Sequence, residues 1–229
     1  MSSFLELAQK VAQESGTVSG TQPTTVLAQS GRLRDIVGWV QSAYRAIQVK
    51  HEAWLWLQGE FETDLVIGTK AYSGTDLSVT DLSRFLLRDR VVSAYLTATG
   101  VSDEAFLLPL DWNTFYDRFM VGSARSVAGK PQYYSVDEAG QIVLYPNPDA
   151  ATTIHARYRK APQELTVDAS VPNMPVQFHD LIVWHALLFL GGYDESMAQY
   201  PIWNMNYRSM MSDLEISQLP NIVLGETLA

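Results

Sequence analysis

One stretch constrains the fold of this chain more than any other: residues 176–191, VQFHDLIVWHALLFLG, are apolar on nearly every side at helical spacing. A helix without a polar face has to be central or sandwiched between neighbouring elements. Gly191 and Gly192 are expected to end it. The longest apolar run, 181–190, is interrupted by His185 and reaches only about half of a bilayer span, so no transmembrane helix is expected. The fold must therefore place other elements around this helix.

A second helix is predicted over residues 32–48, and its apolar residues form a single stripe. The stripe residues lie one, three or four positions apart: Leu33, Ile36, Val37, Val40, Tyr44 and Ile47. Such a stripe needs an apolar neighbour, and we expect it to pack on the helix over 176–191. The candidate packing residues, within one copy of the chain or between copies, are Ile36, Val40, Tyr44, Ile47, Trp54, Leu181, Trp184, Leu188 and Phe189.

Helical spacing also marks both ends of the chain. Apolar residues recur at this spacing over 4–15, and a last helix is predicted over 201–217. Residues 16–31 are rich in Gly, Ser and Thr, which is typical of a surface loop. Residues 218–229 have neither a helical nor a strand pattern of their own, and we expect them to form a C-terminal arm.

The middle of the chain has a different pattern, in which Gly and Thr separate short β-rich runs. The runs over 64–69, 90–97 and 104–108 predict strands. Residues 110–120 predict a short helix with Asp111 as its N-cap, because an aspartate side chain accepts hydrogen bonds from the first helical amides.

Residues 131–160 give the clearest strand signal. Two apolar runs, 133–136 and 142–145, are separated by a turn at 137–140 and followed by a turn at 146–149. The third run alternates Ile154, Ala156 and Tyr158 with Thr153, His155, Arg157 and Arg159. Alternation at period two predicts a three-stranded antiparallel meander with exposed turns. We expect it to lie at the periphery, away from the helical body.

The predicted fold class is therefore α+β: a helical bundle formed by the N- and C-terminal helices, with a β-rich antiparallel meander as an insert. The expected helical body comprises 1–60 and 173–217, and the β-rich insert comprises 61–172. The arm at 218–229 follows the last helix.

Composition excludes several classes of protein. The chain has no cysteine, so it has neither disulfides nor a cysteine-ligated zinc. Its 16 Lys and Arg stand against 25 Asp and Glu, for a net charge of -9, and such a balance disfavours a tight grip on nucleic acid phosphates. The first residues lack the cationic region of a secretory signal, and none is expected.

The motifs of catalytic and metal sites are missing. There are four histidines, and His179 and His185 lie six positions apart, so they point to different sides of a helix. The sequence has no HExxH zinc motif, no nucleophile elbow around Ser123 and no glycine-rich phosphate loop. Adjacent carboxylates in loops are expected to face solvent. We predict no catalytic, cofactor-binding or metal-binding residues.

Aromatic residues are numerous, with 6 Trp and 11 Tyr. Part of them must form the core. Others on strands and loops, such as Tyr133, Tyr145 and Tyr200, would suit an interface with another protein, where aromatic residues are enriched.

Five segments in order resemble a known family: GRLRDIVGWVQSAYRAIQ, WLWLQGEFE, PQYYSVDEAGQIVLYPNPDA, ARYRKAPQELT and PNMPVQFHDLIVWHALL. Together they are similar to the head-to-tail adaptor (connector) proteins of tailed bacteriophages, especially those of short-tailed phages. The resemblance spans most of residues 3–217, and the ordered combination carries it rather than any one motif.

The resemblance implies a structural virion protein that is not an enzyme. In that family, copies form a ring beneath the portal vertex, usually twelve to match the portal. The ring extends the DNA channel and offers a platform for tail or nozzle proteins. The expected partners are further copies of the chain, the portal protein and tail proteins, and no cofactor or membrane is implied. DNA would pass through an acidic lumen without specific binding, and assembly would take place in the host cytoplasm.

The C-terminal arm carries an apolar triplet, Ile222, Val223 and Leu224, which we predict to bind the portal. Two alternatives stay open. A small soluble enzyme would need a pocket with convergent polar groups, and a free-standing protein- or carbohydrate-binding module would stay monomeric with an aromatic groove.

Overall fold

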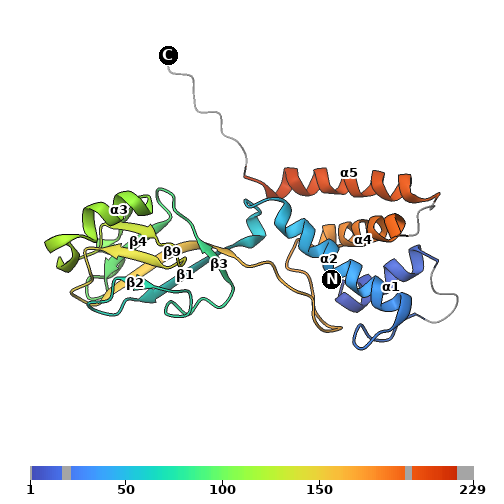
Figure 1. Ribbon diagram of the computed structural model, residues 1–229, viewed down its shortest axis with the longest axis horizontal. Helices are drawn as coiled ribbons and strands as arrows, with labels where there is room; N and C mark the ends of the chain where they lie inside the picture. The colour runs from blue at the N-terminus through green and yellow to red at the C-terminus, as the bar shows by residue number, and fades with distance from the viewer. Residues whose placement is uncertain (1, 17–21, 194–197, 221–229) are drawn as a thin grey trace, which may run out of the picture. The chain divides into compact units, whose positions relative to one another are not determined.

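The computed structural model describes residues 2–16, 22–193 and 198–220. The chain divides into two compact units, which we call the helical unit (Met1–Leu57 with Pro162–Ala229) and the sheet unit (Gln58–Ala161). Helices lie at both ends of the chain and strands in its middle, so the predicted α+β class is confirmed (Figure 1).

The elements of the helical unit are α1 (Phe4–Glu14), α2 (Gly31–Lys50), α4 (His179–Tyr193), α5 (Tyr200–Gln218) and single 3-10 turns at Leu55–Leu57 and Val176–Phe178. The strands, all in the sheet unit, are β1 (Gln58–Asp64), β2 (Ala71–Tyr72), β3 (Leu82–Phe85), β4 (Val92–Leu96), β5 (Ala105–Phe106), β6 (Leu108–Pro109), β7 (Tyr133–Val136), β8 (Ile142–Tyr145) and β9 (Thr152–Lys160). The sheet unit also holds α3 (Trp112–Phe119) and 3-10 turns at Gly100–Asp103 and Gly122–Ser126.

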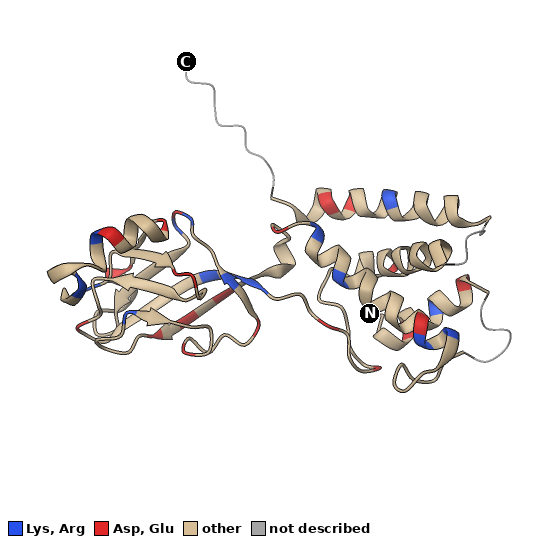
Figure 2. Cartoon of the chain, viewed as in Figure 1, with Lys and Arg blue, Asp and Glu red and all other residues tan. Residues whose placement is uncertain are grey.

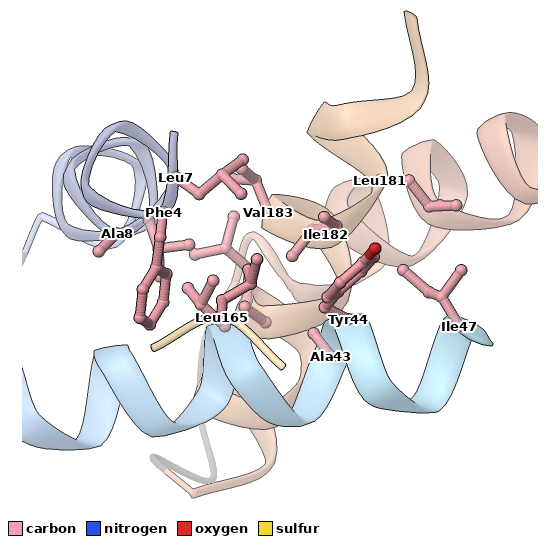
Figure 3. Packing of buried hydrophobic residues seen from close by; sticks show 14 of the residues in the cluster. Phe4, Leu7, Ala8, Ala43, Tyr44, Ile47, Leu165, Leu181, Ile182 and Val183 are labelled. Carbon is pink, nitrogen blue, oxygen red and sulfur yellow. The ribbon is translucent and has the colours of Figure 1, made fainter. Parts of the chain in front are cut away.

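Helix α4 is the centre of the helical unit, as its apolar sequence predicts. It packs against α1, α2 and α5. Figure 3 shows Phe4 and Leu7 of α1, Tyr44 and Ile47 of α2, and Leu181, Ile182 and Val183 of α4 converging on one core. All of these side chains are buried. The apolar faces of α1, α2 and α4 pack against one another, and the removal of this apolar surface from water stabilises the helical unit.

Gly191 and Gly192 do not end this helix, contrary to the sequence prediction. Helix α4 continues through both to Tyr193. A Cβ at Gly191 would lie 2.6 Å from the Tyr200 ring, whereas one at Gly192 would meet nothing within 4 Å. Gly191 is therefore the place where the first turn of α5 comes close to α4, and its missing side chain makes room for that approach.

Residues 162–172, which the sequence analysis assigned to the β-rich insert, lie in the helical unit. Two glutamines hold this segment on α2: the Gln163 backbone N–H donates to Gln48 Oε1 at 2.8 Å, and Gln48 Nε2 donates to the Gln163 carbonyl at 3.0 Å. The Tyr44 hydroxyl donates to Gln163 Oε1 at 2.8 Å, and burial raises the pKa of Tyr44 to about 12, so this donor keeps its proton. Leu165 completes the attachment by entering the helical core.

The strands form two sheets. One has five strands, ordered β1-β9-β4-β5 with β3 also paired to β9, and the other has four, ordered β2-β8-β7-β6. The antiparallel hairpin of β7 and β8 confirms two strands of the predicted meander. The third strand is a correction, because β9 pairs with β1, β3 and β4 instead of β8. A nine-residue strand finds a longer partner in β1 than the four-residue β8 offers.

Other predictions in this unit hold in part. Strand β4 lies within 90–97, and Asp111 caps α3 by accepting from the Thr114 N–H at 3.0 Å, as predicted. The prediction of a strand over 64–69 is wrong, because β1 ends at Asp64, the first residue of that range. The turn at 138–140 is exposed, whereas the second predicted turn is packed, with Pro148 buried.

Candidate assembly surfaces

Two histidines of the helical unit, His51 and His179, have hydrogen-bond partners that give them structural roles. His179 is buried, its Nδ1 accepts from the Ser2 N–H at 3.2 Å, and its Nε2 donates to the Met174 carbonyl at 3.1 Å. Burial lowers the pKa of His179, so the ring stays neutral. Among the described residues, no group of three or more His, Cys, Asp and Glu side chains is placed to hold a metal ion.

A charged cluster joins the end of α2 to α5. Glu215 Oε1 lies 2.9 Å from Lys50 Nζ and 2.8 Å from His51 Nε2. The hydrogen bond from Lys50 is the main cause that lowers the pKa of Glu215, and the hydrogen bond from His51 adds to it. This cluster positions two helices relative to each other, which is a structural role.

The hollows on the helical unit are open to solvent. One of 260 Å³ lies beside Gln41, Arg45 and Gln163, and one of 580 Å³ follows α2 past Gly38 and Trp39. A third, of 440 Å³, lies between α4 and α5, and its lining includes Phe178, Trp184 and Met210. Their shallow, mixed walls offer contact area to another macromolecule rather than an enclosed binding site.

Helix α5 carries an uncovered apolar stripe. Its inner side is buried on α4 through Trp203, Met211 and Leu214, while Ile202, Met205 and Ile216 on the outer side are 55%, 64% and 75% exposed. These outer residues, with Ser209 and Ser212 between them, lie three and four positions apart. Ile202 and Met205 form an exposed apolar pair, and Ile216 lies about three helical turns further along the same face. Exposed apolar side chains on one helix face are candidates for contact with another protein.

The sequence analysis named Tyr200, the first residue of α5, as an interface candidate, but none of the outer residues Ile202, Met205 and Ile216. The outer residues Ile202, Met205 and Ile216 follow helical spacing, and so do the buried residues of the same helix. Periodicity alone does not tell which of the two sets of residues is buried.

The structure separates the candidate packing residues into two groups. Six are buried within the helical unit: Ile36, Val40, Tyr44, Ile47, Trp54 and Leu181. The other three reach its surface: Trp184 and Leu188 are partly buried, and Phe189 is 38% exposed. Only the second group can contact a further copy of the chain. The predicted portal-binding residues Ile222, Val223 and Leu224 lie outside the described residues.

The sheet unit exposes both apolar and charged side chains. Val66, Ile67 and Val101 are each more than half exposed, and one face of the five-stranded sheet is polar. On β9, Ile154, Ala156 and Tyr158 point into the core, so the alternate residues share the opposite face. The β1 residues registered with that second face are Gln58, Glu60, Glu62 and Asp64. Figure 2 shows Asp and Glu along β1, and Lys and Arg gathered around β3 and the adjoining end of β9.

No helix in the described parts of the chain is long and apolar enough to cross a membrane. Uncovered apolar side chains on one helix and a charged sheet face are surfaces of the kind that contacts with other proteins use.

The particular family follows from comparison. The family model described as SU10 adaptor protein matches residues 2–224, and the chain belongs to this family of phage head-to-tail adaptors. The match covers nearly the whole chain, both units included. No curated protein matches the chain. The family confirms the resemblance found in the sequence, makes the chain a virion component, and argues against an enzyme.

Proposed function

We propose that copies of this chain assemble as a ring beneath the portal vertex and join the phage head to its tail. Twelve copies would match the portal symmetry, extend the DNA channel and present a platform for tail or nozzle proteins. The single observation that carries this proposal is the match to the adaptor family over residues 2–224. Assembly would take place in the host cytoplasm, before the completed ring becomes part of the virion.

Contacts between helical units would use the side chains that their own cores leave uncovered. These are Trp184, Leu188 and Phe189 on α4, together with the α5 stripe of Ile202, Met205 and Ile216. A ring requires two different patches that complement each other, because each copy meets its two neighbours through opposite sides. The apolar surface would be removed from water at each contact, which supplies the driving force.

The arm at 218–229 would attach the ring to the portal, with Ile222, Val223 and Leu224 as the residues that enter portal pockets. Ordering a chain segment costs about 1–2 kcal/mol per residue, which apolar burial has to offset. Several arms engaging one portal would act at high effective concentration. The net charge of -9 supports the passage of DNA, since an acidic lumen does not hold phosphates.

The test is reconstitution with the purified portal of the same phage. Mass measurement by light scattering and imaging by electron microscopy should show several adaptor copies as a ring on each portal. The I222S/V223S/L224S variant should lose portal attachment by at least about tenfold, and the neighbouring G225S/E226S/T227S variant is the matched control. A wild-type chain that stays monomeric in the presence of portal would contradict the proposal.

A further inference from the structure

Four loops gather at one end of the sheet unit. Asp64, the last residue of β1, is registered with Thr153 at the start of β9. Leu96, the last residue of β4, is registered with Thr152, so β1 and β4 end where β9 begins. Both chain connections with the helical unit lie at the other end of β1 and β9. The loop tip, as we call it, comprises residues 65–70, 97–103, 120–130 and 146–151.

Hydrogen bonds between backbones hold the loop tip together, and the loop over 146–151 is bonded to each of the other three. These bonds run from the Gly68 N–H to the Pro148 carbonyl (2.7 Å), from the Asn147 N–H to the Val127 carbonyl (3.1 Å) and from the Thr97 N–H to the Ala151 carbonyl (3.0 Å). The Tyr72 hydroxyl lies 2.9 Å from the Val66 carbonyl oxygen and 2.8 Å from that of Thr69, which fixes the first loop. A surface that is ordered in advance loses little conformational entropy when it binds.

The loop tip exposes five aliphatic side chains. Val66, Ile67, Val101 and Val121 are each more than half exposed, and Val127 is 41% exposed. They come from three different loops, and the hydrogen bonds above bring these loops to one end of the unit. Exposed apolar side chains gathered in one region are candidates for contact with another macromolecule.

Two like charges lie beside each other at the loop tip. Lys70 is partly buried, and this burial together with the positive charge of Arg125 lowers the pKa of Lys70. Lys70 Nζ lies 3.7 Å from Met120 Sδ, and among the described residues neither Lys70 nor Arg125 has an ion-pair partner. A carboxylate supplied from outside would offset the repulsion between the two cations. Charge complementarity therefore favours an acidic partner.

The combination of these side chains favours a protein as that partner. DNA phosphates would bind the two cations but gain nothing from five aliphatic side chains. Attachment to a membrane surface commonly uses Trp and Tyr at the interface or a cluster of several cations, and Lys130 at the tip is already paired with Asp103. An apolar centre with charges at its border is the usual composition of a contact between proteins.

We propose that the loop tip binds the tail nozzle protein that follows the adaptor, through an apolar patch bordered by carboxylates on that protein. This inference rests on the ring proposed above and names the surface of its tail platform. The portal and neighbour contacts proposed above use the arm at 218–229 and helices α4 and α5, all in the helical unit, so the loop tip is left for a third partner. Val66 and Ile67 enter the apolar patch, and Lys70 and Arg125 pair with its carboxylates.

Serine substitution tests the apolar contact. V66S/I67S changes the loop tip, and the matched control V167S/V176S changes two similarly exposed valines of the helical unit. Each variant is assembled on the portal, light scattering reports the ring, and circular dichroism reports folding. Biolayer interferometry then measures binding of the purified tail nozzle protein of the same phage to these rings. The V66S/I67S ring should bind at least about tenfold more weakly than wild type, and the control should bind as wild type does.

Charge reversal tests the polar part of the contact. R125E places a carboxylate opposite the carboxylates of the partner, and R88E is the control, at an exposed arginine between β3 and β4. At about 0.1 M salt the R125E ring should bind the nozzle protein at least about threefold more weakly than wild type. The difference should shrink at about 0.5 M salt, because screening shortens the reach of exposed charges. The R88E ring should bind as wild type does at both salt concentrations.

Four outcomes would overturn the inference, and they are distinguishable. If the nozzle protein does not bind wild-type rings, or binds V66S/I67S rings equally well, this contact is wrong and the proposed ring stands. If the loop-tip variants are folded but form no ring on the portal, whereas the controls do, the loop tip serves assembly of the ring itself. If they bind the nozzle protein normally but lose retention of a DNA fragment or of anionic vesicles, the loop tip serves nucleic acid or lipid. If wild type itself never gathers on the portal, the proposed function fails and this inference fails with it.

Discussion

Two exposed surfaces of this adaptor, one on each unit, differ in their chemistry. The helical unit leaves apolar side chains uncovered along α5, with Ile216 75% exposed, whereas the sheet unit exposes carboxylates on β1 and arginines around β3. Apolar contacts persist or strengthen in salt, while contacts between exposed charges weaken. A contact made through the α5 face would therefore be less sensitive to salt than one made through the charged face of the sheet.

The units also differ in how their cores are built. In the helical unit, each helix is a local structure whose apolar face packs on α4. In the sheet unit, β9 joins strands from distant parts of the chain, and the hydrogen bond between Thr153 and Asp64 spans 89 positions. A substitution in the helical unit should therefore act by leaving a cavity, and one in the sheet unit by disturbing a strand pairing.

The largest effect is expected at Ile47 in the core of the helical unit. Ile47→Ala should lower the free energy of unfolding by about 2–5 kcal/mol, because the fully buried side chain would leave a cavity beside α4. Urea unfolding followed by tryptophan fluorescence measures it, since five of the six tryptophans lie in this unit.

Val49, two positions along the same helix, is the control for Ile47. Its side chain is 57% exposed, and Val49→Ala should change the stability by less than about 0.5 kcal/mol. Equal losses at the two positions would show that the α2 stripe is not oriented toward α4.

A smaller loss is expected at Gly59 in the sheet unit. A Cβ there would lie 2.5 Å from the Tyr158 ring, and the 2.6 Å hydrogen bond from the Tyr158 hydroxyl to Asp81 keeps that ring from moving aside. Gly59→Ala should therefore cost about 1–3 kcal/mol through overpacking. Amide hydrogen exchange along β9 checks this, and unchanged protection of the β9 amides would contradict the close contact.

The contrast between the units also explains what the sequence could predict. The helices over 4–15, 32–48, 176–191 and 201–217 follow from periodicity, because a helix is stabilised by neighbours three and four positions away. The pairing of β9 with β1 does not follow, because alternation identifies a strand and its inner face but not its partner. The alternating polar residues at 153–159 indicated a polar face of this strand. They did not show that the carboxylates of β1 lie beside that face.

Close packing between elements could not be predicted from the sequence either. Gly191 has the sequence context of a helix stop, and only the position of Tyr200 shows that it makes room for α5. Residues 162–172 have no regular pattern, so their attachment to α2 through Gln48 and Gln163 had no sequence signal. For the same reason, the surface candidates on α4 and α5 could be separated from core residues only by burial in the folded unit.

A glycine in the helical unit should respond with the opposite sign to Gly59. Gly38 lies within α2, and a Cβ there would meet nothing within 4 Å. Gly38→Ala should raise the free energy of unfolding by about 0.5–1 kcal/mol, because alanine loses less backbone entropy in a helix. Thermal unfolding of the free subunit measures the gain. A loss of stability would mean that the α2 surface beside Gly38 is covered in the free subunit.

The smallest effect concerns pH and again separates the units. The folded-state pKa of Glu215 lies below its ordinary value of 4.5, mainly because of the hydrogen bond from Lys50. The stabilisation is therefore present above pH 4.5 and is lost as pH falls through the lower folded-state value. Because the group is partly exposed, it should contribute about 0.5 kcal/mol or less. Urea unfolding at pH 7 and pH 3 measures how much the free energy of unfolding falls in acid. Glu215→Gln should remove the part of this fall that comes from Glu215. The control Glu138→Gln, at an exposed turn of the sheet unit, should leave the fall unchanged. An acid dependence that is the same in wild type and in Glu215→Gln would show that the cluster joining α2 to α5 adds nothing to stability.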